Sequence, residues 1–329
     1  MNAIISRHLF CFIFPLLLAI YIMPLLIKIA LKFNILDLPD GRIKKHKLPT
    51  PYLGGFALYI PFITTLAIAY PFQNQILWLL LGCTLLLFVG FIDDLKVMTP
   101  IQKLAGQIVA VICFLKGGYS LKTDFFSNGF NILFSAFGML SIINAFNLID
   151  VMDGLVTIVS IFSTLSFLII AFLFKQYYLT ILLLAFLAPL LVFFFYNKPP
   201  AKIYLGDAGA LFIGGFFAAL PQLFNWSSQH YIAYYVPVII LAIPLLELFF
   251  LVIIRTLKGI PFYRGSPHHF AIYLKNKGWP ISKILYLISF LCLILAIVSF
   301  LFLFQFISLF TTFLLGLVFI IFWIFIIFT

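Results

Sequence analysis

The 329-residue chain has few charged side chains and no long polar segment. Asp, Glu, Lys and Arg make up 9% of its residues, whereas about 25% is usual in a soluble domain. Hydrophobic residues make up 65%. No polar run is long enough to fold as a soluble domain, so the sequence predicts a single membrane domain.

Cysteine is also scarce. Cys11, Cys83, Cys113 and Cys292 all lie in apolar stretches, without CxxC spacing or a directly adjacent His. A disulfide framework or a cysteine metal site is therefore not expected. Apolar residues run continuously instead of alternating, which disfavours a β-barrel. No internal repeat stands out, although an inverted-repeat transporter would show one.

What the chain has instead is a series of apolar stretches of nearly the length of a bilayer-crossing helix. They predict an all-α polytopic integral membrane protein with about 10–11 transmembrane helices. The first stretch is longer than a signal-peptide core and no clear cleavage site follows it, so we expect a retained helix. Eleven candidate spans lie near residues 9–31, 53–71, 76–92, 103–118, 129–149, 155–174, 178–196, 203–221, 232–254, 283–303 and 306–328.

The basic residues predict how the spans are oriented. With the N-terminus outside, the inner connections contain 16 of the 20 Lys and Arg residues. This is the bias of the positive-inside rule, and eleven spans then place the C-terminus in the cytoplasm. The same rule accounts for the formal net charge of +11, so no nucleic-acid partner is expected. The predicted location is the inner, or plasma, membrane.

The acidic residues gather on the same predicted face. Seven of the nine fall on that side, while Asp124 lies outside and Glu247 lies within a span. The positive-inside rule does not require carboxylates to follow the lysines, so their gathering predicts an active site at the cytoplasmic face. Glu247 is either functional or a structural group that is protonated or paired with Arg255, two turns away.

Carboxylates flank two of these inner connections. Asp93 and Asp94 end the third span, and adjacent carboxylates usually need a nearby cation. Mg²⁺ is the natural ion when a phosphate supplies the other ligands; a solvated helix end paired with Lys96 is the alternative. Asp207 lies between Gly206 and Gly209, which permit close backbone approach to a phosphate. The alternative there is an ordinary loop with a capping Asp207.

Two amides are followed by two carboxylates at the end of the fifth span, each three positions from the last: Asn144, Asn147, Asp150 and Asp153. These groups suit a uracil edge, ribose hydroxyls or metal-bound water; interhelical polar contacts are the alternative. Three residues turn an α-helix by about 300°, so the four side chains cannot all share one face. We therefore expect the helix to tighten towards 3₁₀ or to end before Asp153 and turn.

Two further inner connections carry basic groups. Arg264, His268 and His269 lie in the longest one, where they suit diphosphate contacts or proton transfer; surface histidines are the alternative. Lys45 and His46 belong to a basic cluster between the first two spans, which suits anionic lipid or a substrate phosphate.

In this order the segments resemble the polyprenyl-phosphate N-acetylhexosamine-1-phosphate transferases, of the MraY/WecA type. The resemblance runs from Asp37 to about Trp279 and rests on five motifs in register. It implies transfer of a sugar 1-phosphate from a UDP-sugar to a membrane polyprenyl phosphate, here undecaprenyl phosphate, with release of UMP. The implied cofactor is Mg²⁺, with Mn²⁺ as an alternative. The implied partners are the two substrates and membrane lipid, and a homodimer is left open.

The resemblance also implies roles for single residues. Asp93 matches the proposed base or nucleophile, Asp94 completes the pair and shares the metal with Asp207, and His268 and His269 match a histidine motif near the diphosphate. The implied substrate-binding residues are Lys45, His46 and Thr50 of a basic loop, Asn144, Asn147, Asp150 and Asp153 of the nucleotide segment, Gly206 and Arg264.

Three positions depart from the family pattern. Val151 stands where Gly is usual, Ala210 stands where Ser is usual, and the histidine motif has two His instead of three. The last departure argues against a UDP-muramoyl-pentapeptide donor and favours UDP-N-acetylglucosamine or a relative.

Two other functions fit parts of the pattern. A magnesium-dependent intramembrane prenyltransferase would use Asp93 and Asp94 but leaves Asp207 and the histidine pair unexplained. A cation-coupled transporter would place polar groups near mid-span and on both faces, whereas Glu247 is the one acid predicted inside a span.

Overall fold

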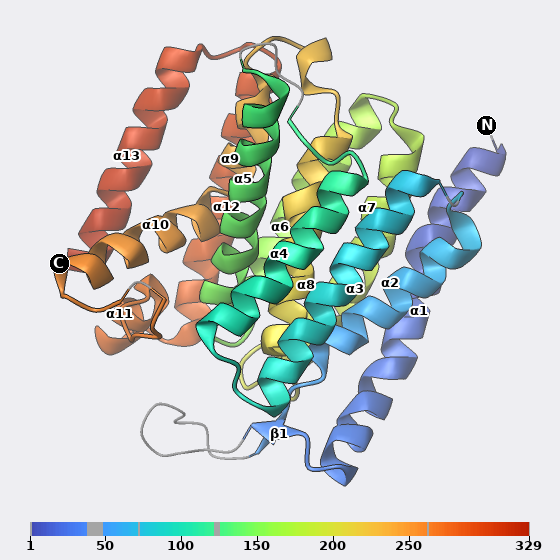
Figure 1. The fold of residues 1–329 in the computed structure, drawn as a ribbon, viewed down its shortest axis with the longest axis vertical. Coiled ribbons are helices and arrows are strands. Elements are labelled where there is room, and N and C mark those ends of the chain that lie inside the picture. The colour runs from blue at the N-terminus through green and yellow to red at the C-terminus, as the bar shows by residue number, and fades with distance from the viewer. Residues whose placement is uncertain (1, 38–48, 72, 122–125, 262, 329) are drawn as a thin grey trace.

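The computed structural model describes residues 2–37, 49–71, 73–121, 126–261 and 263–328, and helices dominate it (Figure 1). In this part of the chain a single small sheet pairs β1 (Leu36–Asp37) antiparallel with β2 (Thr50–Pro51). The α-helices are α1 (Asn2–Lys32), α2 (Gly54–Ala69), α3 (Asn74–Leu95), α4 (Pro100–Lys116), α5 (Asn128–Leu148), α6 (Leu155–Leu173), α7 (Tyr177–Asn197), α8 (Gly206–Ala219), α9 (Val236–Ile240), α10 (Ala242–Leu257), α11 (Phe270–Asn276), α12 (Ile281–Leu303) and α13 (Leu309–Phe328). Three 3₁₀ helices, η1 (Leu220–Leu223), η2 (Trp226–Ser228) and η3 (Ala233–Tyr235), join α8 to α9. The all-α polytopic prediction is confirmed.

Each predicted span contains a helix, but not all of these helices are long. Among the described residues, seven are long and apolar enough to cross a membrane alone, or eight if one bent pair counts as a span. Helices α2, α4 and α8 have 16, 17 and 14 residues. At about 1.5 Å per residue they are shorter than the roughly 30 Å hydrocarbon core.

The span predicted near residues 232–254 consists of two helices instead of one. The chain bends by 73° between α9 and α10, at Leu241. Pro244 lies in the first turn of α10 and has no N–H to donate to the preceding turn, so the break falls where a proline is tolerated. Helix α11, which follows the histidine pair, was not predicted.

The polar connections lie at one end of the helical body. In Figure 1 the N-terminus is at the upper right, and the α3–α4, α5–α6 and α7–α8 connections lie towards the bottom, with α11 at the lower left. We call this lower end, which contains connections 96–99, 149–154 and 198–205, the site end. The structure thus gathers the segments that the sequence grouped on one face.

Helix α8 lies at the centre of the bundle. Its residues from Ala208 to Ala219 are all buried, and it packs against α2, α3 and α5. Aromatic rings fill the layer around its far half: Phe216 stacks on Phe186 with centroids 3.8 Å apart, and Phe217 stacks on Phe146 at 5.0 Å. The one acid of this helix, Asp207, lies in its first turn, at the site end.

Glycines let the first turn of α8 touch its neighbours backbone to backbone. A Cβ on Gly90 of α3 would lie 2.3 Å from the carbonyl oxygen of Asp207, and one on Gly55 of α2 would lie 2.5 Å from the amide nitrogen of Gly209. Both distances are shorter than any ordinary contact. The position of the start of α8 is therefore set by close packing.

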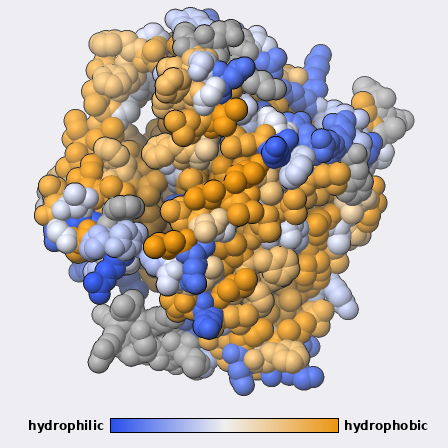
Figure 2. All heavy atoms as spheres, viewed as in Figure 1, coloured by the Kyte–Doolittle hydropathy of each residue, from blue (hydrophilic) through white to orange (hydrophobic). Residues whose placement is uncertain are grey.

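The outer surface of the body is apolar over its middle. Figure 2 shows a broad hydrophobic area across this face, with hydrophilic residues towards the upper right and the lower edge. Phe88 of α3, Ile108 of α4 and Leu133 of α5 are among the exposed large apolar side chains. Large apolar side chains left in contact with the surroundings over several helices are typical of a lipid-facing surface.

Candidate active site at the start of helix α8

The amide-rich segment ends in a turn, as one of the two sequence alternatives predicted. Helix α5 ends at Leu148, and Gly154 precedes α6 with a φ of +78°, in the left-handed region that favours glycine. Val151 has no positive φ. The glycine that the turn needs is Gly154, so the Val151 departure causes no backbone strain.

A buried amide joins this turn to the connection before α8. Asn197 accepts a hydrogen bond from the N–H of Gly154 at 3.0 Å and donates one to the carbonyl of Ile203 at 3.0 Å. Beside it, Asp153 accepts from the N–H of Ala201 at 3.0 Å. These bonds satisfy backbone groups that loops otherwise leave unpaired, and they fix the α5–α6 turn against the α7–α8 connection.

Asp94 caps helix α8 from a neighbouring helix. Its two carboxylate oxygens accept hydrogen bonds from the N–H groups of Asp207, at 2.8 Å, and Ala208, at 3.0 Å. Gly206 has a φ of +73°, and a Cβ there would lie 2.7 Å from the Asp94 carboxylate. A carboxylate is favourable at a helix N-terminus. Gly206 thus makes room for the cap, and the metal-binding role of Asp94 stays a prediction.

A lysine bridges two of the predicted catalytic carboxylates. Lys103 Nζ, in the first turn of α4, lies 2.9 Å from Asp93 and 3.1 Å from Asp207. Asp93 also accepts the N–H of Met98 at 2.6 Å, and Asn147 donates to Asp207. The Asp207 side chain remains 34% exposed against 10% for Asp93. Of the two, Asp207 is the one open to a ligand.

Asp150 is electrostatically coupled to the same cluster. Its side chain is half-buried in the turn, and no hydrogen bond to it is found among the described residues. Burial raises the pKa of Asp150 well above its ordinary value, and the neighbouring Asp207, Asp94 and Asp153 add to this shift. A carboxylate surrounded by like charges is a favourable place for a cation.

Asn144 is held by another helix. Its amide exchanges two hydrogen bonds with Gln107 of α4, at 3.2 and 2.8 Å, and donates a third to the carbonyl of Leu140. An interhelical polar contact of this kind is the alternative role predicted for Asn144 from the sequence. The substrate-binding role of Asn144 stays a prediction.

The basic loop is described only at its end. Thr50 is buried on β2, and the following Pro51 accepts the N–H of Tyr204, at 2.7 Å, in the connection that leads into α8. Thr50 therefore lies next to the α7–α8 connection. Lys45 and His46 lie outside the described residues.

The histidine segment is attached to α10. His269 Nδ1 lies 3.0 Å from the carboxylate of Glu247, while Ser266 accepts a hydrogen bond from Arg255 Nε at 2.9 Å. Arg264 is exposed. The structure therefore brings the carboxylates together around α8 and holds the two histidines on a different pair of helices at the same end.

Comparison with known proteins identifies the family. The model described as glycosyl transferase family 4 matches residues 76–225. The probable undecaprenyl-phosphate N-acetylglucosaminyl 1-phosphate transferase of Bacillus subtilis (strain 168) is 30% identical over 89% of this chain and 85% of its own. The chain belongs to glycosyl transferase family 4. The predicted resemblance is confirmed, and the protein is a transferase embedded in the membrane by several helices.

Other members of glycosyl transferase family 4 are similar over much of the chain. The phospho-N-acetylmuramoyl-pentapeptide-transferase of Enterococcus hirae is 30% identical over 74% of this chain and 82% of its own. That of Carboxydothermus hydrogenoformans is 28% identical over 79% of this chain and 86% of its own. The matched family region contains Asp93, Asp94, Asp150 and Asp207.

Sequence reasoning missed Lys103 as a site residue, although a local signal was present. Thr99 and Gln102 form a capping box: the Gln102 N–H donates to Thr99 Oγ1 at 3.3 Å, and Gln102 Oε1 accepts the Thr99 N–H at 3.0 Å. With Pro100 as the first helical residue, this pattern starts a helix at that point. Lys103 is thereby placed in the first turn, close to the end of α3.

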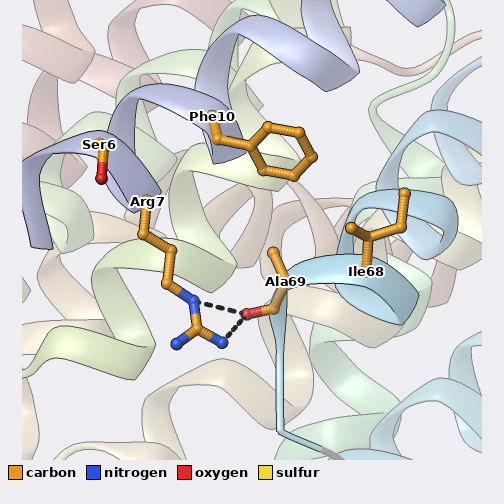
Figure 3. A pocket seen from close by; sticks show the side chains of 5 residues that line it. All are labelled: Ser6, Arg7, Phe10, Ile68 and Ala69. Carbon is orange, nitrogen blue, oxygen red and sulfur yellow. Dashed lines mark hydrogen bonds between the residues drawn. The ribbon is translucent and has the colours of Figure 1, made fainter. Parts of the chain in front are cut away.

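A pocket of about 330 Å³ lies away from this cluster, between the start of α1 and the end of α2 (Figure 3). Arg7 points into it and donates from Nε to the carbonyl of Ala69 at 2.9 Å, and from Nη2 to the same oxygen. Cations are favourable at helix C-termini. The pocket therefore contains a cap of α2 and is separate from the candidate active site.

Proposed function

We propose that this family member transfers N-acetylglucosamine 1-phosphate from its UDP-sugar to undecaprenyl phosphate and releases UMP. The observation that carries the proposal is the cluster of Asp93, Asp150 and Asp207 around Lys103 at the start of a buried apolar helix. The Bacillus subtilis relative, whose printed name states this transfer, supports it. The distribution of Lys and Arg supports a cytoplasmic-face site in the inner membrane.

Mg²⁺ is the proposed cofactor, with Mn²⁺ as an alternative. The described residues contain no group of three or more His, Cys, Asp or Glu side chains that would hold a metal alone. Proteins usually bind Mg²⁺ through one or two carboxylates and leave the other positions to phosphate oxygens and water. Asp150, which accepts no hydrogen bond from the described residues, and the part-exposed Asp207 fit this requirement. When bound, the ion would neutralise negative charge on the diphosphate.

The reaction joins two anions, and the site has to offset their repulsion. An oxygen of the acceptor phosphate attacks the phosphorus attached to the sugar, and the bond from that phosphorus to the UMP oxygen breaks. Lys103 supplies a positive charge already held in place by Asp93 and Asp207, so little reorganisation is needed during the reaction. Asn147 orients Asp207. Asp93, held by Lys103 and the Met98 N–H, is placed to accept a proton or to orient the attacking oxygen.

The direct test is UMP release by the purified protein with undecaprenyl phosphate and a panel of UDP-sugars. We expect UMP with UDP-N-acetylglucosamine, no release after the divalent ions are chelated, and recovery when Mg²⁺ is added back. Release with a different UDP-sugar alone would correct the donor. No UMP with any UDP-sugar tested would overturn the proposal.

A further inference from the structure

Glu247 is a buried carboxylate in the middle of α10, with 1% of its side chain exposed. A carboxylate in this position has lost its hydration and needs donors from the protein. Two contacts come from the segment at the start of α11: His269 Nδ1 lies 3.0 Å from Oε1, and the N–H of Phe270 donates to the same oxygen at 3.3 Å. The acid therefore ties α10 to the histidine segment.

The same helix holds this segment at a second point. Arg255 donates from Nε to the Ser266 hydroxyl at 2.9 Å. Arg255 follows Glu247 by eight residues, about 12 Å along a helix. The segment from Ser266 to Phe270 is thus fastened to α10 at both ends. On its other side the Phe270 ring packs on Trp323 of α13, with centroids 4.5 Å apart.

The two histidines in this segment differ. His269 is 6% exposed and its Nδ1 is taken by the Glu247 carboxylate. His268 is more exposed as a whole, although its Nδ1 is buried and has no hydrogen-bond partner in the described part of the chain. Burial lowers the pKa of His268, and the nearby charges of Lys258, Arg255 and His269 lower it further. His268 therefore lies between the two contacts that hold this segment on α10.

We infer that Glu247 is a positioning residue: through His269 and the Phe270 N–H it fixes the segment that presents His268 to the substrate diphosphate. This inference rests on the proposed function and on the family resemblance, which implies that the histidine motif lies near the diphosphate. In this arrangement His268 touches the substrate, and His269 acts only through the segment that it holds.

Conservative and truncating variants separate positioning from general stability. Glu247→Ala removes both contacts, and we expect kcat for UMP release to fall at least about tenfold. Glu247→Gln and His269→Asn keep the acceptor and the Nδ1-position donor, so each should stay within about threefold of wild type. The double variant Glu247→Ala/His269→Ala should lose no more activity than Glu247→Ala alone, because Glu247→Ala already removes the contact with His269.

A measurement without substrate tests the structural part alone. Modification by diethyl pyrocarbonate, followed by peptide mass spectrometry, should find His269 protected in the wild type and reactive in Glu247→Ala. Leu251→Ala, a buried truncation on the same helix, should lower thermal stability and leave His269 protected. Equal protection of His269 in wild type and Glu247→Ala would overturn the inference, as would a Glu247→Gln enzyme as inactive as Glu247→Ala. Protection as expected without UMP release by wild type would contradict the proposed function alone.

Discussion

Two helices at the site end begin against a carboxylate from another helix, and the two are held differently. At α8, Asp94 accepts two N–H groups, and Gly90 brings the backbones of α3 and α8 into contact. At α11, Glu247 accepts one N–H and contacts a histidine ring, and side chains make the attachment. The first region is fixed by packing that tolerates no added atom. The second depends on a few hydrogen bonds that substitutions can remove one at a time.

The largest effect is expected at the fixed region, where Asp207 faces the ligand. Asp207→Asn keeps the size of the side chain and removes the charge, so UMP release should fall at least about 10³-fold. Circular dichroism and thermal unfolding should match wild type, because the helix N–H groups that Asp94 accepts are unchanged. An Asp207→Asn enzyme with more than a tenth of wild-type activity would contradict this role.

Packing around α8 gives the next prediction. Gly90→Ala would place a Cβ 2.3 Å from the Asp207 carbonyl, so we expect a stability loss of about 1–3 kcal/mol and an activity loss of about 10²-fold through displacement of Asp207. Gly138→Ala in α5 is the matched control, since its Cβ would meet no atom within 4 Å. Equal unfolding temperatures for the two variants would argue against backbone packing at Gly90.

Lys103 carries the positive charge between two carboxylates of the cluster. Lys103→Met removes a positive charge from between Asp93 and Asp207, so the maximal rate should fall about tenfold or more. The same change removes repulsion of a metal ion, so the Mg²⁺ concentration at half-maximal rate should fall. Lys96→Met, at an exposed lysine beyond the same helix end, should change neither quantity. A rise in the Mg²⁺ requirement of Lys103→Met would show that the lysine does not compete with the ion.

The smallest effect is expected away from the site end. Arg7→Gln removes the cap of α2 and should lower the free energy of unfolding by about 1 kcal/mol. The kcat for UMP release should stay at the wild-type value, because the pocket around Arg7 is separate from the carboxylates. A change in kcat without a change in stability would show that this pocket takes part in the reaction.

The features that sequence could predict are local ones. Apolar runs give the helices, and the gathering of acids with the basic connections marks the end of the body where Asp93, Asp150 and Asp207 meet. The number of residues per helical turn also predicted that the chain turns after α5, before Gly154. These signals work because each depends on spacing within one segment.

The features that sequence missed depend on partners far along the chain. From the sequence, the predicted partner of Glu247 was Arg255, two turns away on the same helix. In the structure the Glu247 carboxylate contacts His269, 22 residues further along the chain. Asn144 of α5 forms hydrogen bonds with Gln107 of α4, which lies 37 residues earlier in the chain. A hydropathy window likewise cannot detect the 73° bend between α9 and α10, because both halves are apolar.

The Mg²⁺ dependence of the Asp150→Asn enzyme shows most directly whether the carboxylates at the start of α8 hold the metal ion. Asp150 has no hydrogen-bond donor among the described residues and lies among the other carboxylates, so we expect it to hold the metal ion. Losing one carboxylate should raise the Mg²⁺ concentration at half-maximal UMP release at least about tenfold, opposite in sign to the shift for Lys103→Met. The same Mg²⁺ dependence as wild type, at any maximal rate, would contradict the claim that the start of α8 holds the metal and the donor diphosphate.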